Sequence, residues 1–113
     1  MEVRMEAIAA LGRAEFSPEK MSKSTLAESE RILVGLNCFR PGQEHAVHTH
    51  AGQDKLYHVL SGRGEFQVGD DRLELGAGEL VLVPGGVPHG AACAGDEDLV
   101  VMVVMSPPPS RRV

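Results

Sequence analysis

The sequence predicts an all-β fold, an antiparallel sandwich or barrel, from three observations. Short apolar or alternating segments recur along the chain, with turn signals about every eight to twelve residues. No segment shows the periodicity of a long helix. Residues 99–105 form an unbroken apolar run rich in β-branched side chains, which is typical of a strand buried on both faces.

The N-terminal part, residues 1–30, is expected to be an edge segment of one domain. Residues 3–8 alternate like a strand, whereas residues 6–11 are rich in alanine and leave a helical turn as an alternative. A turn follows around Pro18, because proline fixes its own φ and keeps the preceding residue away from helix. Residues 21–28 then have the pattern of an edge strand.

Residues 31–105 are expected to form the barrel itself. An apolar run over residues 32–39 predicts a buried strand, and a turn cluster between two alternating segments predicts a hairpin. A short apolar strand ends at Pro84, and an acidic turn precedes the last strand. The remaining residues, 106–113, contain three prolines, which provide no donor to a sheet, so they are expected to form a tail.

Length and composition restrict the class of partner. A chain of 113 residues has room for one core, and with no Trp, one Tyr and three Phe this core must consist of Val, Leu, Met and Ala. The net charge of -5 argues against binding to nucleic acid or to anionic membranes. No apolar run approaches the ~20 residues of a membrane span. A small molecule is therefore the expected ligand.

The cysteines predict a reducing compartment. Cys38 and Cys93 do not make a disulfide framework in a chain without a secretion signal. We expect two free thiols and a soluble cytoplasmic protein.

The histidines provide the strongest functional signal. His48 and His50 are one residue apart, so in an extended strand both imidazoles project from the same face and can reach one metal ion. His89 follows a Pro/Gly turn far along the chain and is a candidate third ligand. Three neutral imidazoles suit Zn, Fe, Ni, Cu or Mn better than Mg or Ca, which prefer oxygen.

Two spaced motifs give the chain a resemblance to the cupin superfamily over residues 31–105. The first cupin motif is matched by Gly42, His48, His50 and Gly62, and the second by Gly78, Pro84, Gly86 and His89. The resemblance implies a small antiparallel β-barrel, the jelly roll or double-stranded β-helix, with the three histidines as metal ligands. It also suggests that an N-terminal strand over residues 3–8 pairs with a partner subunit. Because a small barrel leaves exposed strand edges, we expect a homodimer, with a monomer whose N-terminus folds back on its own sheet as the alternative.

The fourth ligand position departs from the cupin motif. Lys55 stands where the family usually has Glu, and an inward ammonium would repel a metal or lose its proton. Asp54 fits the motif only with a local bulge, and Gln53 is a weaker donor. Strand alternation separates Lys55 from Asp54, but hydrophobicity does not decide which of the two faces inward.

Other side chains are assigned to the pocket or excluded from it. Tyr57, Phe66 and Met102 are expected to line or close the barrel interior. Cys93 is expected to border the pocket, with a small buried apolar role as the favoured alternative. His45 is interpreted as a solvated loop residue and His58 as a strand histidine rather than a ligand.

Two functions follow, and the sequence leaves open whether the protein is catalytic. In the first, a divalent transition metal on His48, His50, His89 and Asp54 acts on a small molecule, as in the oxygenases and isomerases of the resembled family. In the second, a non-catalytic binding or sensor module holds a sugar-like or acidic molecule, and Lys55 supplies a cation.

Overall fold

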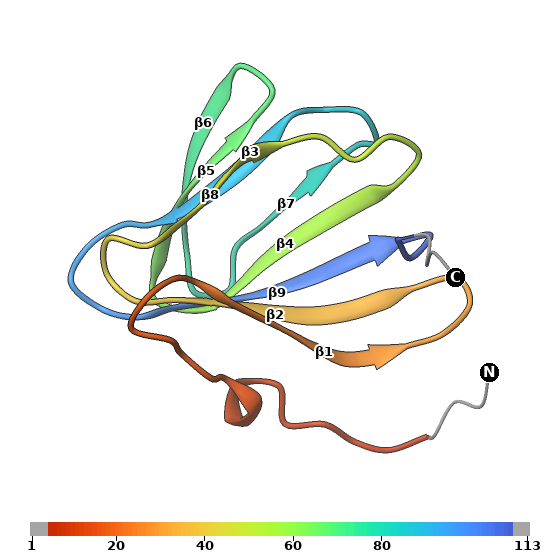
Figure 1. Ribbon diagram of the computed structural model, residues 1–113, viewed down its shortest axis with the longest axis horizontal. Helices are drawn as coiled ribbons and strands as arrows, with labels where there is room; N and C mark the ends of the chain where they lie inside the picture. Colours follow the sequence, from red (N-terminus) through yellow and green to blue (C-terminus); the bar gives the residue numbers. More distant parts are fainter. Residues whose placement is uncertain (1–4, 110–113) are drawn as a thin grey trace.

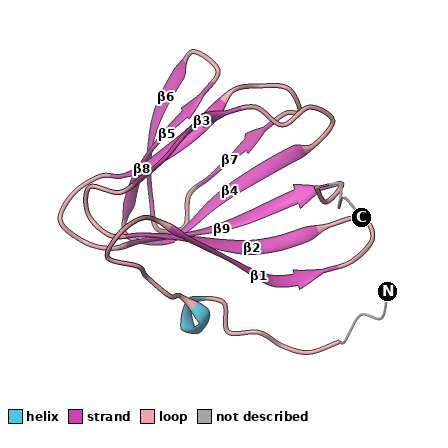
Figure 2. Cartoon of the chain, in the orientation of Figure 1, coloured by secondary structure: helices cyan, strands magenta, loops and turns pink. Residues whose placement is uncertain are grey.

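The chain folds into two antiparallel β-sheets that face each other. The computed structural model describes residues 5–109, and Figure 1 shows the two sheets joined at one end and splayed at the other. The only helical element among these residues is one 3-10 turn, Leu11–Arg13 (Figure 2). In chain order the strands are β1 Ser22–Glu28, β2 Leu33–Phe39, β3 Glu44–His48, β4 Asp54–Ser61, β5 Arg63–Val68, β6 Asp71–Gly76, β7 Leu80–Val83, β8 His89–Cys93 and β9 Leu99–Ser106.

Strand order follows from the burial that each strand needs. The larger sheet has the order β1-β2-β9-β4-β7 and the smaller one β3-β8-β5-β6. β9, the most apolar strand, lies in the middle of the larger sheet and is covered on both faces, as its sequence predicts. β1 lies at an edge of this sheet, and β5 and β6 form the expected hairpin. The all-β jelly roll expected from the sequence is therefore confirmed.

The main core fills the space between the sheets. It takes alternate residues of each strand, because successive side chains of a strand point to opposite faces. Its larger members include Phe39, Tyr57, Val59, Phe66, Leu99 and Val101, so aromatic side chains belong to the core that was expected to consist of Val, Leu, Met and Ala alone. A second cluster lies on the outer face of the larger sheet, where the N-terminal segment packs Phe16 against Leu36, Cys38 and Val100.

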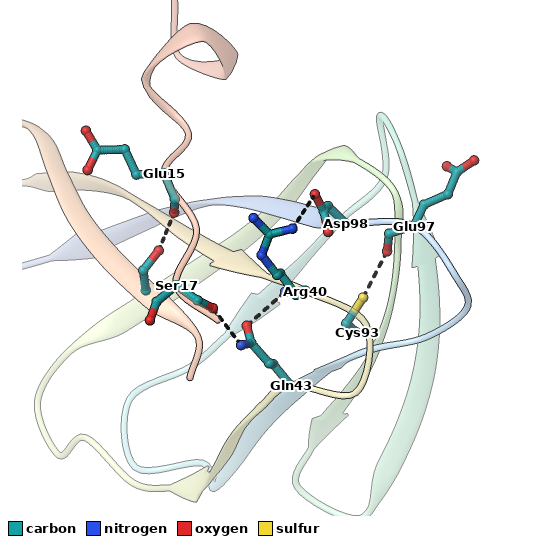
Figure 3. A network of polar contacts seen from close by, with 8 residues as sticks. Glu15, Ser17, Arg40, Gln43, Cys93, Glu97 and Asp98 are labelled. Atoms are coloured by element: carbon teal, nitrogen blue, oxygen red, sulfur yellow. Dashed lines mark hydrogen bonds and ion pairs between the residues drawn. The ribbon is translucent and has the colours of Figure 1, made fainter. Parts of the chain in front are cut away.

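Polar contacts fasten the N-terminal segment to one end of the barrel (Figure 3). Gln43 donates from Nε2 to the Ser17 carbonyl at 2.8 Å and accepts the Arg40 backbone N–H at 2.8 Å. Arg40 also faces Asp98 at 4.0 Å. Cys93 donates through Sγ to the Glu97 carbonyl at 3.1 Å. This end is closed, which leaves the opposite end for a ligand.

Close packing at the closed end requires Gly62. Its φ is 83°, and a Cβ there would lie 2.2 Å from the carbonyl oxygen of Asp98. Any side chain at this position would push β4 away from the start of β9. The first motif therefore ends on glycine for a steric reason.

The strand expected over residues 3–8 does not form within the described part of that segment. Residues 5–9 form no strand, and the start of the predicted strand at residues 3–4 lies outside the described residues. Likewise, only residues 107–109 of the tail beyond β9 are described, and they extend the chain without joining a sheet. Within the described chain, no helix has the length and apolar character needed to cross a membrane.

Candidate metal centre and its pocket

Three histidines from separate segments meet at the open end of the barrel. His48 ends β3, His89 begins β8, and the two are direct cross-strand partners. His50 lies in the loop just beyond β3, and its backbone carbonyl accepts the backbone N–H of Gly86 at 3.1 Å. The potential ligand atoms of the three imidazoles all lie within 4.8 Å of one another, which suits a shared ion. The spacing of His48 and His50 and the turn before His89 thus bring together the predicted trio.

Backbone carbonyls set the tautomers of two of these rings. Nδ1 of His48 lies 2.9 Å from the Ala46 carbonyl oxygen, and Nδ1 of His89 lies 2.8 Å from that of Val87. A carbonyl oxygen only accepts, so each Nδ1 carries the proton and each Nε2 keeps a free lone pair. Both Nε2 atoms are buried and have no hydrogen-bond partner among the described residues. Buried unpaired acceptors with outer-shell carbonyls on the other nitrogen are what a metal-binding imidazole requires.

The electrostatics of the site keep these imidazoles neutral. Burial, helped by the positive charge of Lys55, lowers the pKa of His89 to about 4. Burial also lowers the pKa values of His48 and His50, against the hydrogen bond to the Ala46 carbonyl in the case of His48. At pH 7 the three rings are therefore free of protons on their ligating nitrogens, and the donor set fits a divalent transition metal.

His45 is a fourth imidazole at this site, although we expected it to be a solvated loop residue. Its ring centroid lies 4.3 Å from that of His48, its Nδ1 is buried without a partner, and burial lowers its pKa to about 4. His45 and His48 differ by an odd number of positions, so a regular strand would place them on opposite faces. A register shift in β3 between these residues brings both inward.

Gly90 is the signal that would have indicated the bulge. A Cβ at this position would lie 2.9 Å from the His45 carbonyl oxygen and 3.0 Å from the Val47 backbone nitrogen. β8 therefore needs a residue without a side chain opposite the irregular part of β3. A glycine directly after a motif histidine is consistent with close approach of another strand.

Lys55, and not Asp54, faces the interior. Its side chain is only 5% exposed, and its Nζ lies 4.8 Å from the ring centroid of Tyr57. Burial, with a smaller effect of Lys23, lowers the pKa of Lys55 to about 8. The ammonium thus lies near the imidazoles, at the motif position where the resembled family usually has Glu.

Asp54 has a different partner in the structure. It lies on the outer face of β4, and its Oδ1 accepts the backbone N–H of Gly85 at 2.9 Å. Gln53 donates from Nε2 to the Pro107 carbonyl at 3.1 Å. The Asp54 carboxylate does not belong to the group of potential ligands that the described histidines form. Asp54 and Gln53 both hold loops beside the centre.

The remaining pocket predictions separate into two groups. Tyr57 and Phe66 pack in the main core with ring centroids 4.9 Å apart, and Tyr57 is 6.0 Å from the ring of His89. Cys93 also packs against this core. Met102 lies on the other face of β9, in the second cluster, because its neighbours Val101 and Val103 take the inner face.

A pocket of about 340 Å³ adjoins the centre. Its polar lining includes His45, His50 and Lys55 together with two residues that the sequence analysis left out, Lys23 and Asn37. Asn37 interrupts the apolar run of β2 on the inner face, and this polar interruption is the signal that would have indicated it. Gly35, on the same face, also lines the pocket, and a Cβ there would lie 2.6 Å from the Ser24 carbonyl oxygen, so β1 can approach β2 this closely only beside a glycine.

Comparison with known proteins agrees with this architecture. The family model described as "Cupin domain" matches residues 35–105. An uncharacterized protein of Streptomyces coelicolor is 42% identical over 79 residues, which cover 70% of this chain and 73% of that protein.

Two crystal structures are similar over most of the fold. One, from Thermus thermophilus, has a TM-score of 0.90 and 36% identity, and covers 93% of this chain and 100% of its own. The other, an RmlC-like cupin protein of Desulfovibrio desulfuricans, has a TM-score of 0.83 and 29% identity, and covers 93% and 99%.

Proposed function

The chain belongs to the cupin domain family, and we propose that it is a metal-dependent cupin that binds and acts on a small molecule. The metal would be held by His48, His50 and His89. The pocket beside these residues would receive the small molecule. Nucleic acid and membrane lipid are not part of the proposal, because the chain carries a net charge of -5.

One observation supports this function above the others. The Nε2 atoms of His48 and His89 are buried and unpaired, while a backbone carbonyl holds the proton on Nδ1 of each ring. Leaving two buried acceptors unpaired costs free energy, about 1–3 kcal/mol each. A metal ion that accepts both lone pairs removes this cost.

The donor set indicates the class of metal. Three imidazoles suit Zn, Fe, Mn, Ni or Cu, and they do not rank these metals. When bound, such a metal would supply a Lewis acid or a redox-active centre for the small molecule. Three protein ligands also leave coordination positions for that molecule, whereas structural metal sites are usually closed by four.

The chain's own residues prepare the pocket. Tyr57 and Phe66 are fully buried and pack together beside His89, and the buried Tyr57 hydroxyl has no hydrogen-bond partner among the described residues. His45 stands beside His48 as a neutral imidazole with a free buried nitrogen, so it can accept a proton or a hydrogen bond from a ligand.

Metal analysis of the purified protein tests the proposal. The wild-type protein should carry close to one equivalent of a transition metal, and His48→Ala and His89→Ala should each lose most of it. His58→Ala is the matched control, because His58 lies on the outer face of β4, away from the pocket. Stoichiometric metal that survives both inner substitutions would refute the ligand assignment.

Lys55 favours a second candidate function, a binding module that works without metal. A buried ammonium near the imidazoles opposes a dication, and its charge contributes to the lowered pKa values of all four histidines. Thermal unfolding with and without a chelator separates the two functions, because a bound metal stabilises the folded state by mass action. An unchanged melting temperature, with no metal detected by emission spectroscopy, would favour the metal-free module.

The cellular location and assembly belong to the same proposal. Cys38 and Cys93 are free thiols in the described chain, which suits a reducing cytoplasm. We expect a homodimer, since edge strands β1 and β7 each have one unpaired side within the described chain.

A further inference from the structure

We propose that the pocket beside the imidazoles recognises a small organic anion, a carboxylate, through Lys55 and Asn37, with Lys23 at its rim. This inference deepens the proposed function and rests on it in one respect, because both use the same pocket. It names the chemical class of the ligand, which the metal ligands alone do not determine.

Lys55 is buried without a counter-ion. Its side chain is 5% exposed and makes no ion pair or hydrogen bond among the described residues. Among the described residues, its side-chain nitrogen contacts the face of the Tyr57 ring, with Nζ 4.8 Å from the ring centroid. Such a cation–π contact offsets only part of the cost of burying an ion. An anion in the pocket would offset the remaining cost of burying the Lys55 ammonium.

Asn37 is a second buried polar group that faces the same space. It is 6% exposed and lines the pocket, and its amide makes no hydrogen bond to any described residue. The amide nitrogen and oxygen are not fully enclosed, so a molecule in the pocket can reach them. The amide N–H₂ can donate to a carboxylate oxygen, and the amide oxygen can accept from a neighbouring hydroxyl of the ligand.

The charges that line the pocket are of one sign. Lys55 and Lys23 both line it, and the described lining contains no Asp or Glu. The whole chain has 16 acidic and 11 basic side chains, so an average lining would contain more acids than bases. A positive pocket in an acidic protein concentrates anions locally.

Size and apolar lining restrict the anion further. A volume of about 340 Å³ is at the small end of the range of ligand pockets, about 300–1,000 Å³. Leu33, Val103 and Met105 form an apolar wall, and the register of β2, β9 and β4 places Met105 between Leu33 and Lys55. The ligand therefore combines a carboxylate with a short carbon chain, close enough to His50 for a second polar group to face the imidazoles.

Binding of malonate and butyrate, compared with the neutral malonamide and butyramide, tests the inference. Affinities would be measured by NMR titration at constant ionic strength, on the protein as purified with its metal content determined. We expect the carboxylates to bind and the amides to bind at least about tenfold more weakly, because a hydrogen bond to a charged group contributes about 1.5–3 kcal/mol. Equal binding of acid and amide would overturn the proposal, as would no binding of either acid in the millimolar range.

Variants locate the subsite. Lys55→Met should lower carboxylate affinity about tenfold or more, and Lys23→Glu, at an exposed rim position, should lower it severalfold without risk to the core. Arg13→Met is the matched control, because it removes one positive charge at an exposed site outside the pocket. Should Lys55→Met fail to fold, Lys23→Glu decides. Unchanged carboxylate binding in the folded pocket variants, or an equal loss in Arg13→Met, would contradict the assignment.

The outcomes separate this inference from the proposed metal centre. Lys55→Met should keep its metal, since none of the three ligands is altered. Carboxylate binding that depends on Lys55 in protein without metal would support the anion subsite and count against the metal centre. Bound metal with no carboxylate binding would support the metal centre and count against the anion subsite.

Discussion

At the scale of single residues, His48 and His89 share one local arrangement. Each ring donates Nδ1–H to the carbonyl two residues before it, Ala46 in one case and Val87 in the other. The ring orientation is thus set by the backbone of its own strand. The shared site then needs only the pairing of β3 with β8, which puts the two free Nε2 atoms near each other.

The lowered histidine pKa values predict that the metal-free protein loses stability in acid. The pKa values of His45 and His89 fall from 6.5 to about 4 on folding, mainly through burial. The unfolded chain therefore binds protons below pH 6.5 that the folded protein accepts only near pH 4. The free energy of unfolding therefore has its full value above pH 6.5 and decreases as the pH falls from 6.5 to about 4.

Urea unfolding at a series of pH values measures this effect. His45→Gln should make the dependence of the free energy of unfolding on pH shallower between pH 6.5 and 4, because it removes one of the titrating groups. An identical slope in wild type and variant would show that His45 does not titrate in this range.

Substitution of Asp54 distinguishes a ligand from a loop contact. The Asp54 carboxylate accepts the Gly85 N–H, so Asp54→Ala should lower the free energy of unfolding by about 0.5–1.5 kcal/mol, and Asp54→Asn, which keeps an acceptor oxygen, should lower it less. Metal content, measured by emission spectroscopy, should not change in Asp54→Asn. A large loss of metal in this variant would assign Asp54 to the metal centre after all.

At the scale of elements, the irregular pairing of β3 with β8 shapes the site. The register shift between His45 and His48 turns an odd spacing into two inward side chains. β8 accommodates this shift only because Gly90 leaves room for the backbone of β3. The open end of the barrel thus depends on a bulge as well as on regular alternation.

Gly90→Ala tests this dependence. The added Cβ would meet backbone atoms of β3 at 2.9 and 3.0 Å, so the strand must shift, and we expect a loss of about 1–3 kcal/mol in the free energy of unfolding. Metal affinity should fall as well, because His48 and His89 would no longer pair in register. Gly12→Ala is the control, since its Cβ would have ordinary contact, 3.9 Å from Ala9. Equal stability of the two variants in chemical denaturation would argue against the close approach.

At the scale of the whole molecule, the two sheets close at one end and open at the other. The closed end is fixed by the contacts of Gly62 and by the network around Arg40 and Gln43. The open end carries the imidazoles and the pocket. Outside the pocket, Leu80 and Leu82 on the edge strand β7 remain more than half exposed, at 55% and 58%. Exposed apolar side chains on an edge strand are typical of surfaces that associate.

The predicted homodimer is testable by light scattering at micromolar concentration. One chain has a mass of 12.1 kDa, and the full-length protein should have twice this mass. Deletion of residues 1–11 should shift the protein towards monomer if this segment joins the partner's sheet. A monomeric full-length protein would refute the dimer. A truncated protein that stays dimeric would instead direct attention to β7.

The sequence by itself determined the strands of the barrel, the fold family and the three central histidines, whereas the strand expected over residues 3–8 does not form in its described part. These features depend on local patterns: alternation, turn residues and the fixed spacing of His48, His50 and His89 within two motifs. Lys55, Asp54 and Met102 required the tertiary structure, because alternation defines two faces of a strand without stating which one is covered. The packing of β4 and β9 against the smaller sheet decided that Lys55 points inward, and that Asp54 and Met102 point outward. His45 joined the site only through a bulge, and Asn37 and Lys23 joined the pocket only because β1 and β2 pair beside it. Such contacts link residues far apart in the chain, and no local pattern encodes them.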